Sequence, residues 1–187
     1  MQTEPLTMDK NSPLLEIPPL LLDWYHRTRR VLPWRENPQP YYVWLSEIML
    51  QQTRVEAVKP YFVRFLEALP TIEALANAPE DLLLKLWEGL GYYSRVRNLQ
   101  KAAQVVLSEY GGALPSDPAL LEKLPGIGSY TAGAIASIAF GVPAPAVDGN
   151  VLRVVSRVTA SREDIASPQY KKKTEQAIRE IIPQDRA

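Results

Sequence analysis

The chain has no cysteine and only one histidine, His26, among its 187 residues. Without cysteine it can form neither a disulfide nor a thiolate-held metal centre, and a single histidine cannot hold a metal ion alone. It also lacks any run of about 20 apolar residues, the length that a membrane-spanning helix needs. These absences exclude disulfide-stapled, thiolate-metal and membrane-spanning proteins. They leave His26 as a solvent-facing or capping residue.

An excess of charge of either sign is also missing. The chain has 21 basic and 21 acidic residues and a formal net charge of zero. Such a balance argues against a basic coat over the whole surface, so any contact with nucleic acid must be local and built from loops and helix ends. The first 20 residues do not combine a charged start with an apolar stretch of secretory type. We therefore expect an intracellular protein, cytoplasmic if its source is bacterial.

Residues 1–16 are polar, carry scattered prolines and predict a loose leader. From residue 17 to residue 187 the apolar periodicity is helical, and no alternating strand pattern occurs. The sequence therefore predicts one all-α region. Its expected helices are 19–31 and 41–53, both apolar enough to be buried, then 55–69, 71–77, 80–87, 94–110, 117–123, one that ends at Phe140, 150–160 and 168–182.

A glycine turn lies within Leu124-Pro125-Gly126-Ile127-Gly128-Ser129-Tyr130-Thr131. Gly126 and Gly128 let backbone N–H groups converge on an anion, and Ser129 is suited to cap the helix that follows. A DNA phosphate is the expected anion. The helix itself is small and apolar on all sides, which predicts a central, closely packed position.

Residues 117–140, a short helix, this turn and a longer helix, resemble the helix-hairpin-helix module of DNA repair proteins. A pair of glycines alone would be weak support, because ordinary turns use glycine too. Contacts of this kind bind the phosphate backbone and read no base sequence.

Asp148 follows an extended link that Pro143 and Pro145 impose, and it precedes the next helix. Position alone favours a plain N-cap. The cap is compatible with a chemical role, because a carboxylate that accepts backbone N–H bonds at a helix start stays ionised. An ionised carboxylate can stabilise a developing cation.

Glu47 lies within a helical segment whose same-face neighbours are mostly apolar: Val43, Trp44, Leu50 and Gln51. Burial in such a setting raises the pKa of a carboxyl group and makes it a candidate general acid. Spacing alone favours the plainer alternative, a partly exposed glutamate at a helix edge.

Five motifs in order resemble the catalytic region of adenine DNA glycosylases of the MutY type, over roughly residues 20–185. They are Leu32-Pro33-Trp34-Arg35, Ser46 to Thr53, Gly89 to Arg95, Leu124 to Thr131 and Val147-Asp148-Gly149-Asn150. The resemblance implies the all-α helix-hairpin-helix glycosylase fold, with two lobes and the active site between them. It implies removal of adenine mispaired with 8-oxoguanine or guanine, a double-stranded DNA partner and a monomeric enzyme.

The same resemblance implies three catalytic residues. Glu47 matches the acid that protonates N7 of the flipped adenine and activates water. Asp148 matches the carboxylate that stabilises the oxocarbenium ion, with a transient covalent bond as one route. Tyr130 stands where endonuclease III-like relatives carry a lysine that forms a Schiff base, which implies a monofunctional hydrolase. Its alternative role is a packed aromatic beside the hairpin.

The remaining residues that the resemblance assigns contact DNA or the base. Gln52 and Tyr92 match residues that wedge into the duplex, and the phosphate would be bound by Gly126, Gly128 and Ser129. Without the resemblance, Gln52 is a polar helix end and Tyr92 a loop aromatic. Matches to the adenine pocket are Trp34, Arg35, Leu50, Val55 and Asn150. Residues 171–173, all lysine, are interpreted as a solvated helix face.

The sequence also departs from the family. Most members carry four cysteines that hold a [4Fe-4S] cluster, followed by a C-terminal domain that recognises 8-oxoguanine. Neither is present before the last residue, Ala187, so we expect a fragment with no cofactor or metal site of its own. Two alternatives stay open: a helix-hairpin-helix DNA-binding fragment without turnover, and an endonuclease III-like glycosylase.

Overall fold

The computed structural model of the chain describes residues 12–185, which contain helices and no β-strand. The elements are η1 (Pro13–Glu16), a 3-10 helix, and α1 (Ile17–Thr28), α2 (Pro33–Glu36), α3 (Pro40–Leu50), α4 (Val55–Ala68), α5 (Ile72–Ala76), α6 (Glu80–Trp87), α7 (Ser94–Glu109), α8 (Pro118–Leu121), α9 (Ser129–Phe140), α10 (Gly149–Val158) and α11 (Pro168–Ile181). The all-α prediction is confirmed. Within the described part of the chain, no helix combines the length and hydrophobicity of a membrane span.

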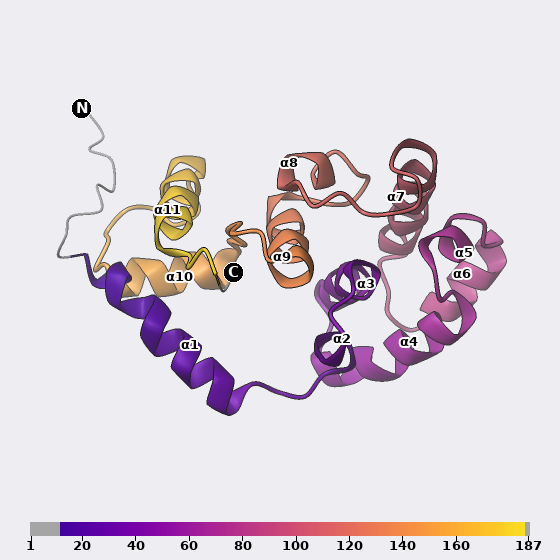
Figure 1. The fold of residues 1–187 in the computed structure, drawn as a ribbon, viewed down its shortest axis with the longest axis horizontal. Coiled ribbons are helices and arrows are strands. Elements are labelled where there is room, and N and C mark those ends of the chain that lie inside the picture. The colour runs from indigo at the N-terminus through magenta and orange to yellow at the C-terminus, as the bar shows by residue number, and fades with distance from the viewer. Residues whose placement is uncertain (1–11, 186–187) are drawn as a thin grey trace.

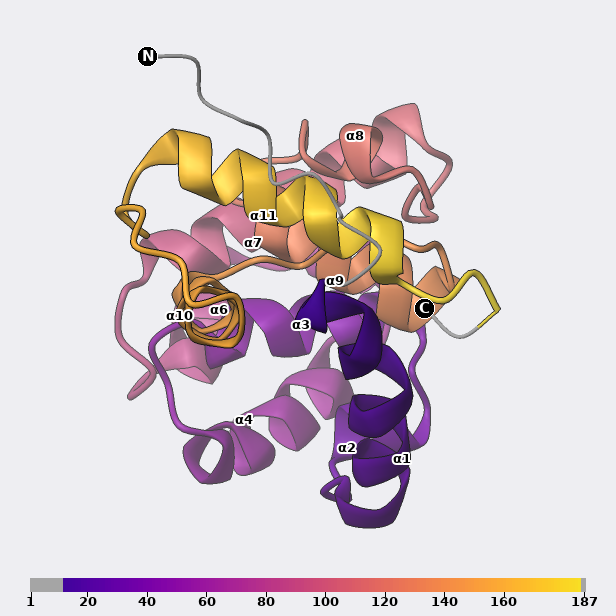
Figure 2. The same ribbon diagram turned by 90° about the vertical axis from the view of Figure 1, so that its left-hand side faces the viewer.

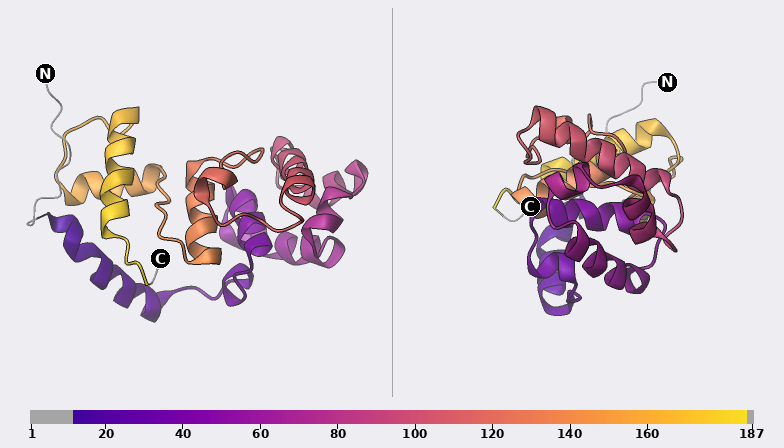
Figure 3. Two further views of the ribbon diagram at one scale, coloured as in Figure 1. Left: turned by 45° about the horizontal axis from the view of Figure 1, so that its top comes forward. Right: turned by 90° about the vertical axis from the view of Figure 1, so that its right-hand side faces the viewer.

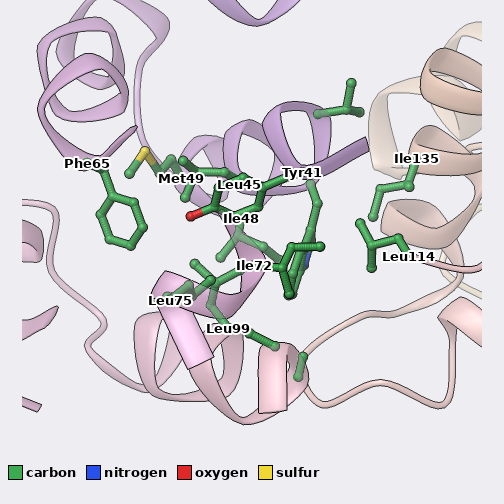
Figure 4. Packing of buried hydrophobic residues seen from close by; sticks show 14 of the residues in the cluster. Tyr41, Leu45, Ile48, Met49, Phe65, Ile72, Leu75, Leu99, Leu114 and Ile135 are labelled. Atoms are coloured by element: carbon green, nitrogen blue, oxygen red, sulfur yellow. The ribbon is translucent and has the colours of Figure 1, made fainter. Parts of the chain in front are cut away.

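Helices α2 to α9 form a larger lobe around one hydrophobic core (Figure 1). Helix α3 lies at its centre and packs against α2, α4, α7 and α9. Its side chains Leu45 and Met49 are fully buried, and Figure 4 shows them among residues of the neighbouring helices, such as Phe65 and Ile135. Because α3 is surrounded on most sides, a polar side chain on it is desolvated unless it faces a cavity.

A smaller lobe contains η1, α1, α10 and α11, so segments from both ends of the described chain lie together (Figures 1 and 3). Leu14 of η1 is buried against Val155 of α10 and Ala177 of α11. In Figure 2, α1 runs from this lobe toward α2 of the larger lobe. The expected two-lobed architecture is thus present, and residues 141–148 and the chain around residue 30 connect the lobes.

Two expectations about the N-terminal part were wrong. The leader predicted over 1–16 ends earlier, because residues 13–16 form η1 and bury Leu14; residues 1–11 lie outside the described residues. The helix predicted over 19–31 was expected to be buried, but α1 buries no residue, and Leu20 and Trp24 are 69% and 56% exposed. Apolar density cannot show whether a helix has a partner, and the main neighbour of α1 is the short η1.

Two helix starts differ from the prediction. Gly128, with extended backbone, is the N-cap of α9, and Ser129 is its first residue and makes no capping hydrogen bond to the backbone of α9. Helix α2 was missed, because prolines at 33, 38 and 40 indicated a break. Pro33 is nevertheless compatible with a helix, since it occupies the first turn, where its missing N–H costs nothing.

Candidate active site

A cavity of about 90 Å³ lies beside Glu47, between α2, α3, the start of α4 and α9. Four of the five predicted pocket residues line it together with Glu47. The complete lining is Arg30, Leu32, Trp34, Arg35, Val43, Ser46, Glu47, Leu50, Val55 and Ile138. Segments far apart in sequence therefore place one carboxyl group and two arginines around a single small, mostly apolar space.

The sequence did not assign half of this lining to a pocket. Val43 and Leu50 lie one turn on either side of Glu47, so helical spacing was a usable signal for Val43. Arg30 and Ile138 come from other segments and carried no local signal, because only the packing of α9 on α3 brings Ile138 there.

The environment of Glu47 favours its protonated form. Burial raises the pKa of this carboxyl group from 4.5 to about 7, and the positive charge of Arg35 lowers it by a smaller amount. The expectation of a desolvated glutamate is confirmed. Near neutral pH, Glu47 therefore populates both its acid and its base form, as an acid–base catalyst requires.

Asp148 is the N-cap of α10. Its Oδ1 accepts hydrogen bonds from the backbone N–H groups of Asn150 and Val151, both at 2.9 Å, and its Oδ2 accepts one from Asn150 Nδ2 at 2.7 Å. Asp148 thereby satisfies two backbone N–H groups at the start of α10 that have no partner within the helix. Asn150 does not line the cavity beside Glu47; it lies next to Asp148 and also accepts a hydrogen bond from Arg153.

Tyr130, the second residue of α9, connects the two carboxylates electrostatically. Burial, followed by the negative charges of Glu47 and Asp148, raises the pKa of its phenol to about 12. A charge effect of this kind requires proximity, so the structure brings all three predicted catalytic residues together. The phenol stays protonated and is available as a hydrogen-bond donor.

Gly133 permits this arrangement. The extended segment that leads to Asp148 crosses α9 there, and a Cβ at Gly133 would overlap the carbonyl oxygen of Pro145. Any larger residue would push the segment away from the helix that carries Tyr130. This close crossing explains why α9 is built from small residues, as its composition predicted.

The glycine turn has the shape expected for phosphate binding. Gly126 has φ +78°, a conformation that favours glycine, and a Cβ there would lie 2.9 Å from Asn98 Cβ. Gly128 has open space around it, so an anion can approach the first N–H groups of α9. Lys171 donates a hydrogen bond to Ser129 Oγ at 3.1 Å and adds a positive charge at this helix start.

Of the other two lysines in the 171–173 run, only Lys172 matches the predicted solvated face, because the side chain of Lys173 is 19% exposed. Lys172 is exposed, and Lys173 forms an ion pair with Glu163 at 2.8 Å. Only Lys171 reaches the predicted phosphate site.

Gln52 and Tyr92 share an uncommon backbone conformation. Their φ angles are +57° and +48°, and both residues are exposed, Tyr92 by 66%. Non-glycine residues in the left-handed region are uncommon and often occur at functional sites. The two residues lie in the turns that follow α3 and precede α7, outside the cavity lining.

The residues present do not fit an iron–sulfur cluster. The whole chain lacks cysteine, and among residues 12–185 no three histidine, aspartate or glutamate side chains group closely enough to hold a metal ion.

Comparisons with known proteins show the family of the chain. Residues 45–184 match the model of the HhH-GPD superfamily base excision DNA repair protein family. The chain is 47% identical to the adenine DNA glycosylase of Rattus norvegicus over 79% of this chain and 30% of that protein. It is 46% identical to the adenine DNA glycosylase of Buchnera aphidicola (subsp. Baizongia pistaciae), over 73% of this chain and 39% of that protein.

Solved structures show the same fold. A thermostable thymine-DNA glycosylase superposes with a TM-score of 0.80 at 26% identity, over 93% of this chain and 80% of that one. A trapped endonuclease III–DNA covalent intermediate superposes with a TM-score of 0.74 at 27% identity, over 92% of this chain and 76% of that one. The chain therefore spans only about a third of the length of the two adenine DNA glycosylases named above.

Proposed function

Because the chain belongs to the HhH-GPD superfamily of base excision DNA repair proteins, we propose that it hydrolyses the N-glycosidic bond of adenine mispaired with 8-oxoguanine or guanine in double-stranded DNA. The adenine DNA glycosylases that it resembles support this substrate. The observation that carries the proposal is the grouping of Glu47, Tyr130 and Asp148, in which one neutral phenol lies near two carboxyl groups of different character.

In the proposed reaction the adenine leaves the base stack and enters the cavity beside Glu47. Glu47, in its acid form, gives its proton to N7 of the base. Protonation makes adenine a better leaving group, so the bond between C1′ and N9 breaks and its electron pair stays on the base. A carboxyl group with a pKa of about 7 suits this step, because it is still partly protonated at neutral pH.

The sugar then carries the positive charge of an oxocarbenium ion. Asp148, whose carboxylate is held by three N–H donors, stabilises this cation. Water attacks C1′ and passes a proton to the Glu47 carboxylate, which restores the acid. The products are free adenine and an abasic site in an intact strand.

Tyr130 supports hydrolysis without strand cleavage. A Schiff base with the sugar requires an amine, and a protonated phenol cannot form one. In the proposed site, Tyr130 instead donates a hydrogen bond toward the carboxylates and orients them.

A single-turnover assay on a duplex with adenine opposite 8-oxoguanine tests the proposal. The wild-type chain is expected to release adenine, and Glu47→Gln, which keeps the shape and removes the acid, to slow release by about 10²- to 10⁴-fold. Glu67→Gln, at an exposed position of α4, is the matched control and should retain the wild-type rate.

Two other outcomes would replace the proposal. Binding to the duplex without adenine release indicates a DNA-binding module without turnover. Trapping of a protein–DNA adduct by borohydride indicates a lyase of the endonuclease III kind and contradicts the role given to Tyr130.

A further inference from the structure

Arg95, in the first turn of α7, extends its side chain to the end of another helix. Its Nη1 donates to the carbonyl oxygens of Ile48 at 3.0 Å, Met49 at 3.2 Å and Gln51 at 2.5 Å. These carbonyls belong to the last turn of α3 and the residue after it. A cation bound there satisfies carbonyls that have no partner within the helix and complements the negative end of its dipole.

The other nitrogen of the same guanidinium binds the turn before α7. Arg95 Nη2 donates to the carbonyl oxygens of Leu90 at 2.9 Å and Gly91 at 3.2 Å. The guanidinium carbon lies 5.3 Å from the ring centre of Trp87 and 5.7 Å from that of Tyr92. One side chain therefore holds two turns that belong to different helices.

Two of the carbonyls that Arg95 binds directly precede Gln52 and Tyr92, the left-handed residues that are predicted to enter the duplex. Gln51 precedes Gln52, and Gly91 precedes Tyr92. Among residues 12–185, the only other non-glycine residue with positive φ is Ala160, in the smaller lobe. A left-handed backbone is costly for Gln and Tyr, so the surrounding structure must hold it in place, and Arg95 supplies contacts directly beside both residues.

Two features of Arg95 oppose its stabilising contacts. A cation in the first turn of α7 is disfavoured by that helix's own dipole, and the Nε of Arg95 is buried without a hydrogen-bond partner. Both features cost stability, whereas the two terminal nitrogens of the planar guanidinium reach two turns at once.

We propose that Arg95 is a positioning residue that fixes the Gln52 turn and the Tyr92 turn relative to each other, so that both side chains enter the duplex together when the target base is extruded. This inference rests on the proposed function. Arg95 acts through the two turns and does not touch the reacting atoms.

Arg95→Lys tests the inference, because one ammonium group keeps the charge but cannot bridge both turns. Single-turnover rates are compared on two duplexes, one with adenine opposite 8-oxoguanine and one with adenine opposite an abasic site, where extrusion is easier. We expect the variant to lose about 10- to 100-fold on the first duplex and at most about twofold on the second. Arg97→Lys, on the same helix and exposed, is the control and should match the wild type on both.

A second measurement does not depend on turnover. In Arg95→Lys, backbone hydrogen exchange should become faster at residues 50–53 and 89–93 and stay unchanged in α11 of the smaller lobe. The rise in fluorescence of 2-aminopurine beside the target base, which reports unstacking on binding, should fall in the same variant.

The outcomes separate the two proposals. If the wild type releases no adenine, the proposed function fails, and exchange and fluorescence alone decide the role of Arg95. If the wild type is active but Arg95→Lys slows both duplexes equally, or changes neither rate nor exchange at the two turns, the positioning role is contradicted.

Discussion

Glu47 lies inside the larger lobe on a helix that is packed on most sides, whereas Asp148 lies at the edge of the smaller lobe and caps α10. Glu47 faces a mostly apolar cavity, and burial raises its pKa to about 7. Asp148 is only partly buried and accepts three hydrogen bonds from N–H groups at a helix start. Packing and hydrogen bonding therefore give two chemically similar side chains different proposed roles, with Glu47 as the proton donor and Asp148 as the fixed anion.

Removing the charge at Asp148 without removing the helix cap should have the largest effect on adenine release. In Asp148→Asn the side-chain oxygen can still accept from the backbone of α10, so the free energy of unfolding should change by less than about 0.5 kcal/mol. Adenine release should slow by about 10²- to 10³-fold, because the oxocarbenium ion loses its counter-charge.

Urea unfolding and single-turnover kinetics measure the two effects separately. Asp148→Ala is the comparison variant, since it also removes the cap and should lose about 1 kcal/mol of stability. An Asp148→Asn variant with the wild-type rate would show that the anion has no chemical role.

The raised pKa of Glu47 makes stability depend on pH. In the unfolded chain this group titrates near 4.5 and in the folded chain near 7, so its contribution to stability is present below about pH 4.5 and is lost as the pH rises toward 7. At pH 8 the buried anion destabilises the fold, and Glu47→Gln should be more stable than the wild type by on the order of 2 kcal/mol.

Urea unfolding at pH 5 and pH 8 checks this prediction. The gain of Glu47→Gln should be small at pH 5 and large at pH 8, and Glu67→Gln should show no such difference. An equal gain at both pH values would mean that the substitution acts through packing and not through the ionisation of Glu47.

Gly133→Ala tests how closely the two regions must approach. The added Cβ would overlap the Pro145 carbonyl, so the free energy of unfolding should fall by about 1–3 kcal/mol and adenine release should slow as Asp148 moves away from Tyr130. Gly149→Ala, where a Cβ meets only the end of Arg153 at 3.6 Å, is the control and should be nearly neutral in stability. A wild-type thermal midpoint for Gly133→Ala would contradict the close crossing.

Tyr130→Phe should give the smallest effect. It removes the hydroxyl that we propose as a hydrogen-bond donor to the carboxyl groups and keeps the ring, so single-turnover release should slow by roughly tenfold, in line with the loss of one hydrogen bond. A loss above about 10³-fold would assign Tyr130 a direct part in the chemistry, and an unchanged rate would assign it to packing alone.

Much of the larger lobe was predictable, because apolar periodicity and proline positions mark helices locally. Residues 80–87 were predicted with both ends correct. The helix predicted over 41–53 ends at Leu50 in the structure, because Arg95 of another helix holds the left-handed turn at Gln52. Local patterns contain no information about such a distant contact.

Some features of the site were likewise predictable from local sequence, and others were not. Neighbours within one turn indicated the apolar setting of Glu47, although spacing alone favoured a partly exposed side chain, and position indicated the capping role of Asp148. The structure shows a desolvated Glu47 and the Asp148 cap. The choice of Ser129 as a cap failed because an extended Gly128 takes that position. Asn150 was grouped with the pocket, but the fold leaves it out of the cavity lining and bonds it to Asp148.

The role of Glu47 as the general acid is tested most directly by the pH dependence of adenine release by the wild-type chain under single-turnover conditions. If Glu47 is the acid, the rate should be highest below about pH 7 and fall toward tenfold per pH unit above it, as the buried carboxyl group loses its proton. A rate that stays constant from pH 6 to pH 9 would contradict the proposal that burial raises the pKa of Glu47 and lets it protonate the base.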